Sequence, residues 1–206
     1  MIWYNTDNLE LLYTPKGKDI KKDLFQKVKK IAIDVAKRND AFRMTSRKML
    51  LEERMSTYAK RTQSIQTDEK VILFSTFDGR NYSDSPKAIY EYMLSDSRFS
   101  EYTFIWAFRN PKKFTFVLDN PNTYIVTVNT PSYEQTCARA KYWFFNYRIS
   151  DHIYPKADQV YVQLWHGTPL KRLGYDIAIS DNAMNSKQEI REKYRVDAEK
   201  FKYILA

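Results

Sequence analysis

From Val71 onward, short apolar runs alternate with segments of helical character. Six apolar runs are candidate strands: 71–76, 103–108, 123–128, 142–145, 160–165 and 202–206. Four intervening segments pair a capping residue with a following proline, as at a helix start: Ser85-Pro86, Asn110-Pro111, Thr130-Pro131 and Thr168-Pro169. A charged helix over 187–194 precedes the last run. Strands that alternate with helices form mostly parallel sheets with helices on both faces, so the pattern predicts an α/β fold.

The residues before 67 have a different texture. They contain fifteen Lys or Arg and eight Asp or Glu, and therefore carry +7 of the net charge of +9. Leu24, Val28, Ile31 and Val35 recur at helical spacing and form an apolar stripe on a basic helix. Such a helix can pack on a domain, lie in a membrane interface or bind nucleic acid. We expect a basic helical segment over 1–66 and an α/β domain over 67–206.

Composition narrows the function classes. A sequence pI of about 9.4 favours an anionic partner. The single cysteine, Cys137, excludes an internal disulfide framework. Because the chain has only two histidines, the sequence does not favour a dedicated metal site. No run of about 18 apolar residues and no export signal pattern occurs. Cys137 is expected in the core, and His152, in a loop with Pro155, at the surface.

The run 160–174 predicts a strand, a tight turn and a helix. Apolar and polar residues alternate up to Leu164, the period breaks at His166-Gly167, and Thr168-Pro169 supplies a helix start. A histidine at the carboxyl end of a parallel strand lies where open α/β sheets bind ligands, and it could act as a general base. Spacing alone leaves open whether His166 is instead a turn histidine bonded to backbone.

A second polar loop follows the first strand. Gly79, Tyr82, Ser83 and Asp84 precede a predicted helix, whose free N–H groups could hold an anionic or hydroxylated ligand. The alternative is that Ser83 and Asp84 only cap the helix.

Three stretches together resemble one family. The run 163–174, QLWHGTPLKRLG, resembles the signature of the CDP-glycerol glycerophosphotransferase family, which includes the polyol-phosphate primases and polymerases of teichoic acid synthesis. The loop from Gly79 to Asp84 and the helix start after it resemble a second hallmark. The run 140–148 resembles the strand between them, with Tyr147 where serine is commoner. The resemblance covers about 71–206.

The resemblance implies a Rossmann-like domain that forms the N-terminal, acceptor-side half of a GT-B fold, preceded by a basic membrane-associating segment. It implies transfer of glycerol phosphate from CDP-glycerol, or of a related group from CDP-ribitol, to a lipid-linked, phosphate-bearing acceptor, without a tightly bound cofactor or metal. His166 would be the general base. The substrate-binding candidates are Gly79, Tyr82, Ser83, Asp84, Asn146, Gly167, Thr168, Lys171 and Arg172.

The resemblance also implies that a second, nucleotide-binding domain is absent from these residues, so we expect the 206-residue chain to be an inactive fragment. It places the protein at the cytoplasmic face of the membrane as a peripheral enzyme that does not bind nucleic acid. Lys171 and Arg172 could neutralise phosphate or be solvated surface charges. The competing interpretation of the whole chain is a non-catalytic, basic α/β module that binds a membrane or nucleic acid.

Overall fold

The computed structural model describes residues 27–28, 30–31, 40–165, 176 and 187–205. By their contacts, Met1–Thr45 and Ser46–Ala206 form two units, and the sheet and the candidate site belong to the second. The predicted boundary between 66 and 67 stays a prediction.

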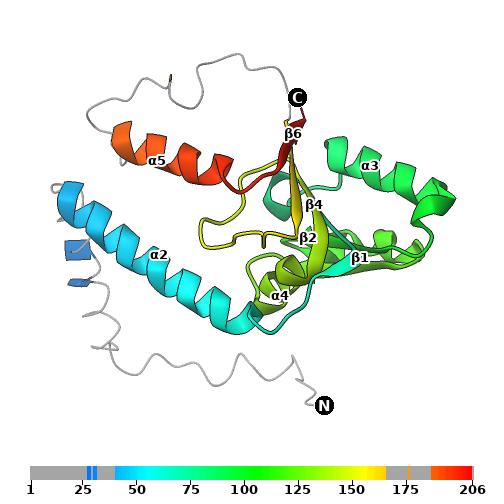
Figure 1. The fold of residues 1–206 in the computed structure, drawn as a ribbon, viewed down its shortest axis with the longest axis horizontal. Helices are drawn as coiled ribbons and strands as arrows, with labels where there is room; N and C mark the ends of the chain where they lie inside the picture. Colours follow the sequence, from blue (N-terminus) through cyan, green and yellow to red (C-terminus); the bar gives the residue numbers. More distant parts are fainter. Residues whose placement is uncertain (1–26, 29, 32–39, 166–175, 177–186, 206) are drawn as a thin grey trace, which may run out of the picture. The chain divides into compact units, whose positions relative to one another are not determined.

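The second unit is built on a sheet of six strands, all parallel (Figure 1). The strands are β1 (Asp68–Ser75), β2 (Thr103–Phe108), β3 (Thr123–Thr127), β4 (Ala140–Phe145), β5 (Val160–Leu164) and β6 (Tyr203–Leu205). All six predicted apolar runs form strands, so the predicted α/β fold with a parallel sheet is confirmed. The order is β3-β2-β1-β4-β5-β6. The chain builds outward from β1 to β3 and then returns to the other side of β1, which makes the carboxyl ends of β1 and β4 the switch point where such sheets bind ligands.

The described helices are α2 (Asp40–Thr62), α3 (Asp84–Ser95), α4 (Pro131–Arg139) and α5 (Lys187–Ala198). Short 3₁₀ helices lie at η2 (Phe77–Gly79), η3 (Ser97–Phe99), η4 (Pro111–Lys113) and η5 (Thr115–Asp119). Among the helices described, none is long and apolar enough to cross a membrane.

The predicted helix starts have different outcomes. At α4 the prediction is confirmed, because the Thr130 hydroxyl accepts the N–H of Tyr133 and Pro131 is the first helical residue. At α3 it is wrong by two residues: the helix begins at Asp84, and Pro86 sits inside the first turn, where a missing N–H costs nothing. Asn110-Pro111 begins only the one-turn η4. Thr168-Pro169 lies outside the described residues.

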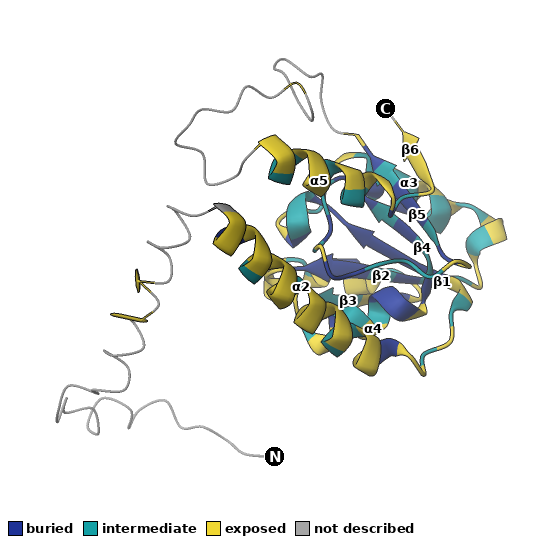
Figure 2. Ribbon diagram, turned by 60° about the vertical axis from the view of Figure 1, so that its left-hand side comes forward, coloured by how far each residue is buried: buried dark blue, intermediate teal, exposed yellow. Residues whose placement is uncertain are grey.

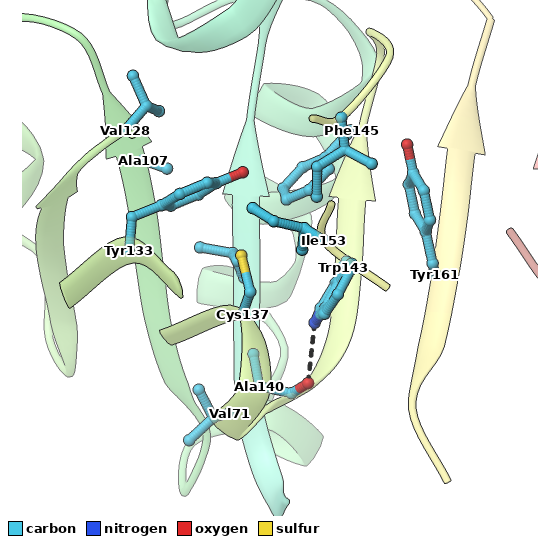
Figure 3. Close-up of a cluster of buried hydrophobic side chains, with 12 residues drawn as sticks. Val71, Ala107, Val128, Tyr133, Cys137, Ala140, Trp143, Phe145, Ile153 and Tyr161 are labelled. Atoms are coloured by element: carbon cyan, nitrogen blue, oxygen red, sulfur yellow. Dashed lines mark hydrogen bonds between the residues drawn. The ribbon is translucent and has the colours of Figure 1, made fainter. Parts of the chain in front are cut away.

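Two apolar clusters cover the two faces of the sheet. One is rich in aromatic side chains and packs α3 and η5 on the sheet through residues such as Phe74, Tyr90 and Trp106. The other packs α4 on the opposite face, where Tyr133 and Cys137 point onto the sheet (Figure 3). Buried residues line both faces of β1 and β2, while β6 and the outer faces of α2 and α5 are exposed (Figure 2). Strands β1 and β2 therefore read as apolar runs without alternation, as doubly covered parallel strands do.

Two residues were expected to lie outside the site, Cys137 in the core and His152 at the surface, and their burial tests both predictions. Cys137 is fully buried, as predicted, and burial raises the pKa of its thiol far above the usual range. The prediction that His152 lies at the surface is wrong, since it is 7% exposed. Its Nε2 lies 3.2 Å from Glu134 Oε1. The partner is eighteen residues away in the sequence, which is why the local pattern did not show it.

Candidate functional site

The loop between β1 and α3 has an unusual backbone. Phe77, Asp78, Gly79 and Asp84 have φ values of 47°, 60°, 73° and 63°. Three of these four are not glycine, and left-handed backbone at such residues costs free energy that the surrounding structure must offset. Strained residues of this kind concentrate at ligand sites. Here they lie at the carboxyl end of β1, at the switch point of the sheet.

Gly79 allows the loop to approach the next strand. Its carbonyl accepts the N–H of Arg109 at 2.7 Å. A Cβ atom at this position would lie 2.8 Å from Arg109 N and 2.9 Å from Val128 Cγ1, closer than real Cβ contacts come. Arg109 also donates through Nε to the Asp78 carbonyl at 2.9 Å and pairs with the Asp78 carboxylate. The start of the loop is therefore fastened to the end of β2.

Asn146 fastens the loop from the other side. It follows β4 directly and is fully buried. Its Oδ1 accepts the Phe77 N–H at 2.8 Å, and its Nδ2 donates to Asp84 Oδ2 at 2.5 Å. One side chain thus joins the start of the loop to the first residue of α3, and the structure brings together the predicted site residues Asp84 and Asn146, with Gly79 in the same loop.

Tyr82 and Ser83 contribute differently. The Tyr82 ring packs edge-on against Trp106, with centroids 4.9 Å apart, and its hydroxyl donates to Glu91 at 3.0 Å. Burial, with the Glu91 contact, raises the pKa of this phenol, which stays neutral. Ser83 is the N-cap residue of α3, but its side chain makes no capping bond. Their substrate contacts stay predictions.

A hollow of about 500 Å³ opens beside this loop. Its wall includes residues that follow β1 and β4, and the side chains of Arg54 from α2 and Lys193 from α5. The charged side chains around it are Asp78, Asp151, Arg54, Arg80, Arg148 and Lys193. Cations therefore outnumber anions by four to two, and the hollow suits an anionic ligand.

A second hollow, of about 550 Å³, adjoins the first and shares Arg54, Asn129 and Ser150 with it. Glu134 lines it and binds both Arg61, at 2.7 Å, and His152. Burial lowers the pKa of His152, which opposes the effect of the Glu134 contact. The His152 Nδ1 atom is buried and has no hydrogen-bond partner among the described residues.

Part of the predicted site lies outside the described residues. This applies to His166, Gly167, Thr168, Lys171 and Arg172. The described chain ends its strand at Leu164, and Trp165 donates its N–H to the Leu205 carbonyl at 2.7 Å. Within the described residues no group of three or more His, Cys, Asp or Glu side chains could hold a metal ion.

Sequence reasoning missed the cations of the first hollow. Arg80 follows Gly79, and Arg148 lies two residues after Asn146, so adjacency to predicted site residues could have indicated both. Arg54 and Lys193 come from helices far away in the sequence and carry no local signal.

The chain matches the family described as CDP-glycerol:poly(glycerophosphate) glycerophosphotransferase over residues 56–206. The chain belongs to this family. The match includes the whole parallel sheet, the loop after β1 and the QLWHGTPLKRLG run, so the resemblance seen in the sequence is confirmed.

Curated relatives are teichoic acid enzymes. A teichoic acid poly(glycerol phosphate) polymerase from Staphylococcus epidermidis is 35% identical over 137 residues, which are 66% of this chain and 18% of that protein. A teichoic acid glycerol-phosphate transferase from Staphylococcus aureus is 30% identical over 159 residues, 77% of this chain and 39% of that protein. The chain therefore spans well under half the length of these relatives.

Solved structures similar to this chain also include a teichoic acid enzyme. The wall teichoic acid polymerase TagF superposes with a TM-score of 0.62 and 31% identity, over 80% of this chain and 40% of that one. A variant of the same polymerase gives a TM-score of 0.63 and 30% identity, over 81% and 41%. A structure of that variant was also obtained after soaking with CDPG.

Proposed function

We propose that this chain forms the acceptor-side part of an enzyme that transfers glycerol phosphate from CDP-glycerol, or a related polyol phosphate from its CDP donor, to a lipid-linked acceptor. The observation that carries the proposal is the family match, which spans the loop after β1 and the run around His166 together. The strained loop and Asn146 at the switch point support it, because parallel sheets bind ligands there.

The reaction needs a base. An acceptor hydroxyl oxygen attacks the phosphorus that bears glycerol, a new P–O bond forms, the bond to CMP breaks, and the proton of the hydroxyl goes to the base. We assign this base to His166, because an imidazole titrates near neutral pH and typically contributes about 10²- to 10⁴-fold. In the sequence it follows the end of β5 by two residues, and β5 is parallel to β4. Gly167 and Thr168 would complete this turn, and Lys171 and Arg172 would neutralise phosphate charge.

The test is CMP release from CDP-glycerol with a lipid-linked acceptor, measured on the protein in its complete natural reading frame. His166→Ala should lower turnover at least about 10²-fold with folding unchanged. Lys112→Ala removes an exposed cation of η4 and is the control, expected to keep turnover near wild type. Equal turnover of His166→Ala and wild type would contradict the assignment, and no CMP release by wild type would favour a non-catalytic binding module. The 206-residue chain alone should release none, because we place donor recognition outside it.

The basic N-terminal segment, residues 1–66, is proposed to hold the protein at the cytoplasmic face of an anionic membrane as a peripheral enzyme. On the described part of α2, Met49 and Leu50 are 65% and 59% exposed beside the exposed Lys48. Exposed apolar side chains among cations suit an anionic bilayer surface. Replacing both Met49 and Leu50 by Gln should reduce sedimentation with phosphatidylglycerol vesicles. Unchanged sedimentation would contradict this role.

A further inference from the structure

The arginines of α2 that face the rest of the second unit recur every seven residues, at Arg47, Arg54 and Arg61. Seven residues are close to two helical turns, so the three share one face of the helix. The outer two form ion pairs: Arg47 with Glu189 of α5 and Arg61 with Glu134 of α4, each at 2.7 Å. Arg54, between them, forms no ion pair with any residue that the structure describes, and lines both hollows instead.

Helix α5 repeats this arrangement with a spacing of four. Glu189, Lys193 and Asp197 share a face because residues four apart are neighbours on a helix. Glu189 pairs with Arg47, and Asp197 Oδ2 accepts from Arg148 Nε at 3.0 Å. Lys193, between them, lines the hollow beside β1 and is unpaired within the described part of the chain. Both helices are therefore held by flanking ion pairs while their middle cations face the same space.

The loop after β1 adds a third cation. Arg80 is exposed, lines the hollow and makes no side-chain ion pair with the described residues. The backbone N–H groups of Gly79 and Arg80 already donate to the Thr76 carbonyl. The N–H of Phe77 is taken by Asn146. These three N–H groups are therefore not free to bind an anion, and the cation that the loop offers to the hollow is the Arg80 side chain.

The opposite charges in the hollow are largely neutralised. Asp78 is paired with Arg109, so its charge is offset. Asp151 is the other anion, and Lys200 donates to its backbone carbonyl and to that of Ser150, both at 3.0 Å. The lysine thereby brings a positive charge next to Asp151. It also holds this part of the wall in place, which lowers the entropy cost of binding.

We infer that Arg54, Arg80 and Lys193 form a subsite for a phosphodiester of the polyol phosphate chain that the acceptor already carries. The inference rests on the proposed function for the identity of the ligand. The location follows from the geometry: three cations from separate elements converge at the switch point, beside a second hollow that shares Arg54 and gives an extended ligand room to continue. Guanidinium and ammonium groups bind phosphate oxygens through charge-assisted hydrogen bonds.

The test is calorimetric titration of the 206-residue chain with a synthetic glycerol phosphate tetramer at low salt. Arg54→Ala, Arg80→Ala and Lys193→Ala should each weaken binding about tenfold, as loss of a hydrogen bond to a charged group does. Lys112→Ala removes an exposed cation of η4 away from the hollow and is the matched control, expected to bind as wild type. Added salt should weaken wild-type binding. Thermal unfolding of each variant checks that its fold is kept.

Two further probes separate other sources of phosphate. CDP-glycerol and phosphatidylglycerol vesicles should not show the same dependence on Arg54, Arg80 and Lys193. The inference is overturned if the tetramer does not bind, if Lys112→Ala weakens binding as much as the others, or if CDP-glycerol or vesicles depend on these residues and the tetramer does not. Binding of the tetramer needs neither the donor nor His166. A failed transfer assay would therefore contradict the proposed function without changing the outcome of the binding test.

Discussion

The amide nitrogen of Asn146 donates to the Asp84 carboxylate across 2.5 Å, and this bond ties the end of β4 to the start of α3. The same side chain accepts the N–H of Phe77. Since Asn146 is fully buried, its bonds are protected from water, and the two ends of the loop after β1 depend on it.

Replacing Asn146 by Ala should lower the free energy of unfolding by about 1–3 kcal/mol, because a backbone donor and a carboxylate lose their buried partner. Asn146→Asp should also destabilise, since it places a second carboxylate against Asp84. Denaturant unfolding measures both. Asn81→Ala, in the same loop but with no side-chain bond in the described chain, is the control and should unfold like wild type. An Asn146→Ala variant as stable as that control would show that the bridge does not hold the loop.

Gly79→Ala should destabilise the protein by more than about 1 kcal/mol. The new Cβ would meet Arg109 N and Val128 Cγ1 at less than 3.0 Å, and the backbone φ of 73° adds strain for any residue with a Cβ. The expected result is a lower melting temperature, together with weaker tetramer binding because Arg80 follows directly. Asn81→Ala again serves as the control. If the variant has the same melting temperature as wild type, the loop can accommodate a Cβ atom at position 79, and the prediction is wrong.

The burial of His152 predicts a specific pH dependence. Burial lowers its folded-state pKa below the ordinary 6.5, so as pH falls through that value the unfolded chain takes up the proton first. The free energy of unfolding should therefore decrease as pH falls from 7 towards 5.5, and the nearby Arg54 and Lys200 act in the same direction. In His152→Gln this pH-dependent part of the free energy of unfolding should be missing. The difference in the free energy of unfolding between wild type and variant should therefore shrink at low pH. If the free energies of unfolding of wild type and variant change in parallel with pH, the prediction is wrong.

Lys200 is 3% exposed, and its ammonium donates to two loop carbonyls. Burial lowers its pKa to about 8, so it is still largely charged at pH 7. Lys200→Met should cost about 1–3 kcal/mol, because both carbonyls lose a charged donor. Lys202→Met is the control, since that side chain is exposed. Urea unfolding at pH 7 compares them, and equal stability of the two variants would count against a structural role for the buried ammonium.

Local sequence was sufficient where a feature depends on neighbours in the chain. Strands β1 and β2 appear as apolar runs because both of their faces are covered. Thr130-Pro131 marks the start of α4 because its cap bond spans three residues. The helix start at Ser85-Pro86 was misplaced because proline is tolerated anywhere in the first turn. The family was recognisable for a related reason: each of its two signature runs, 79–91 and 163–174, is a nearly unbroken stretch of sequence.

By itself, then, the sequence determined the α/β class, the parallel sheet and the family, all of which depend on short periodic patterns or contiguous motifs. Only the tertiary structure decided that Asn146 reaches Asp84, that His152 is buried against Glu134, and that Arg54 and Lys193 converge on Arg80. These relationships join residues between eighteen and well over a hundred positions apart in the chain. No local pattern encodes them, because the strand order and the packing of helices on the sheet bring such residues together only after folding.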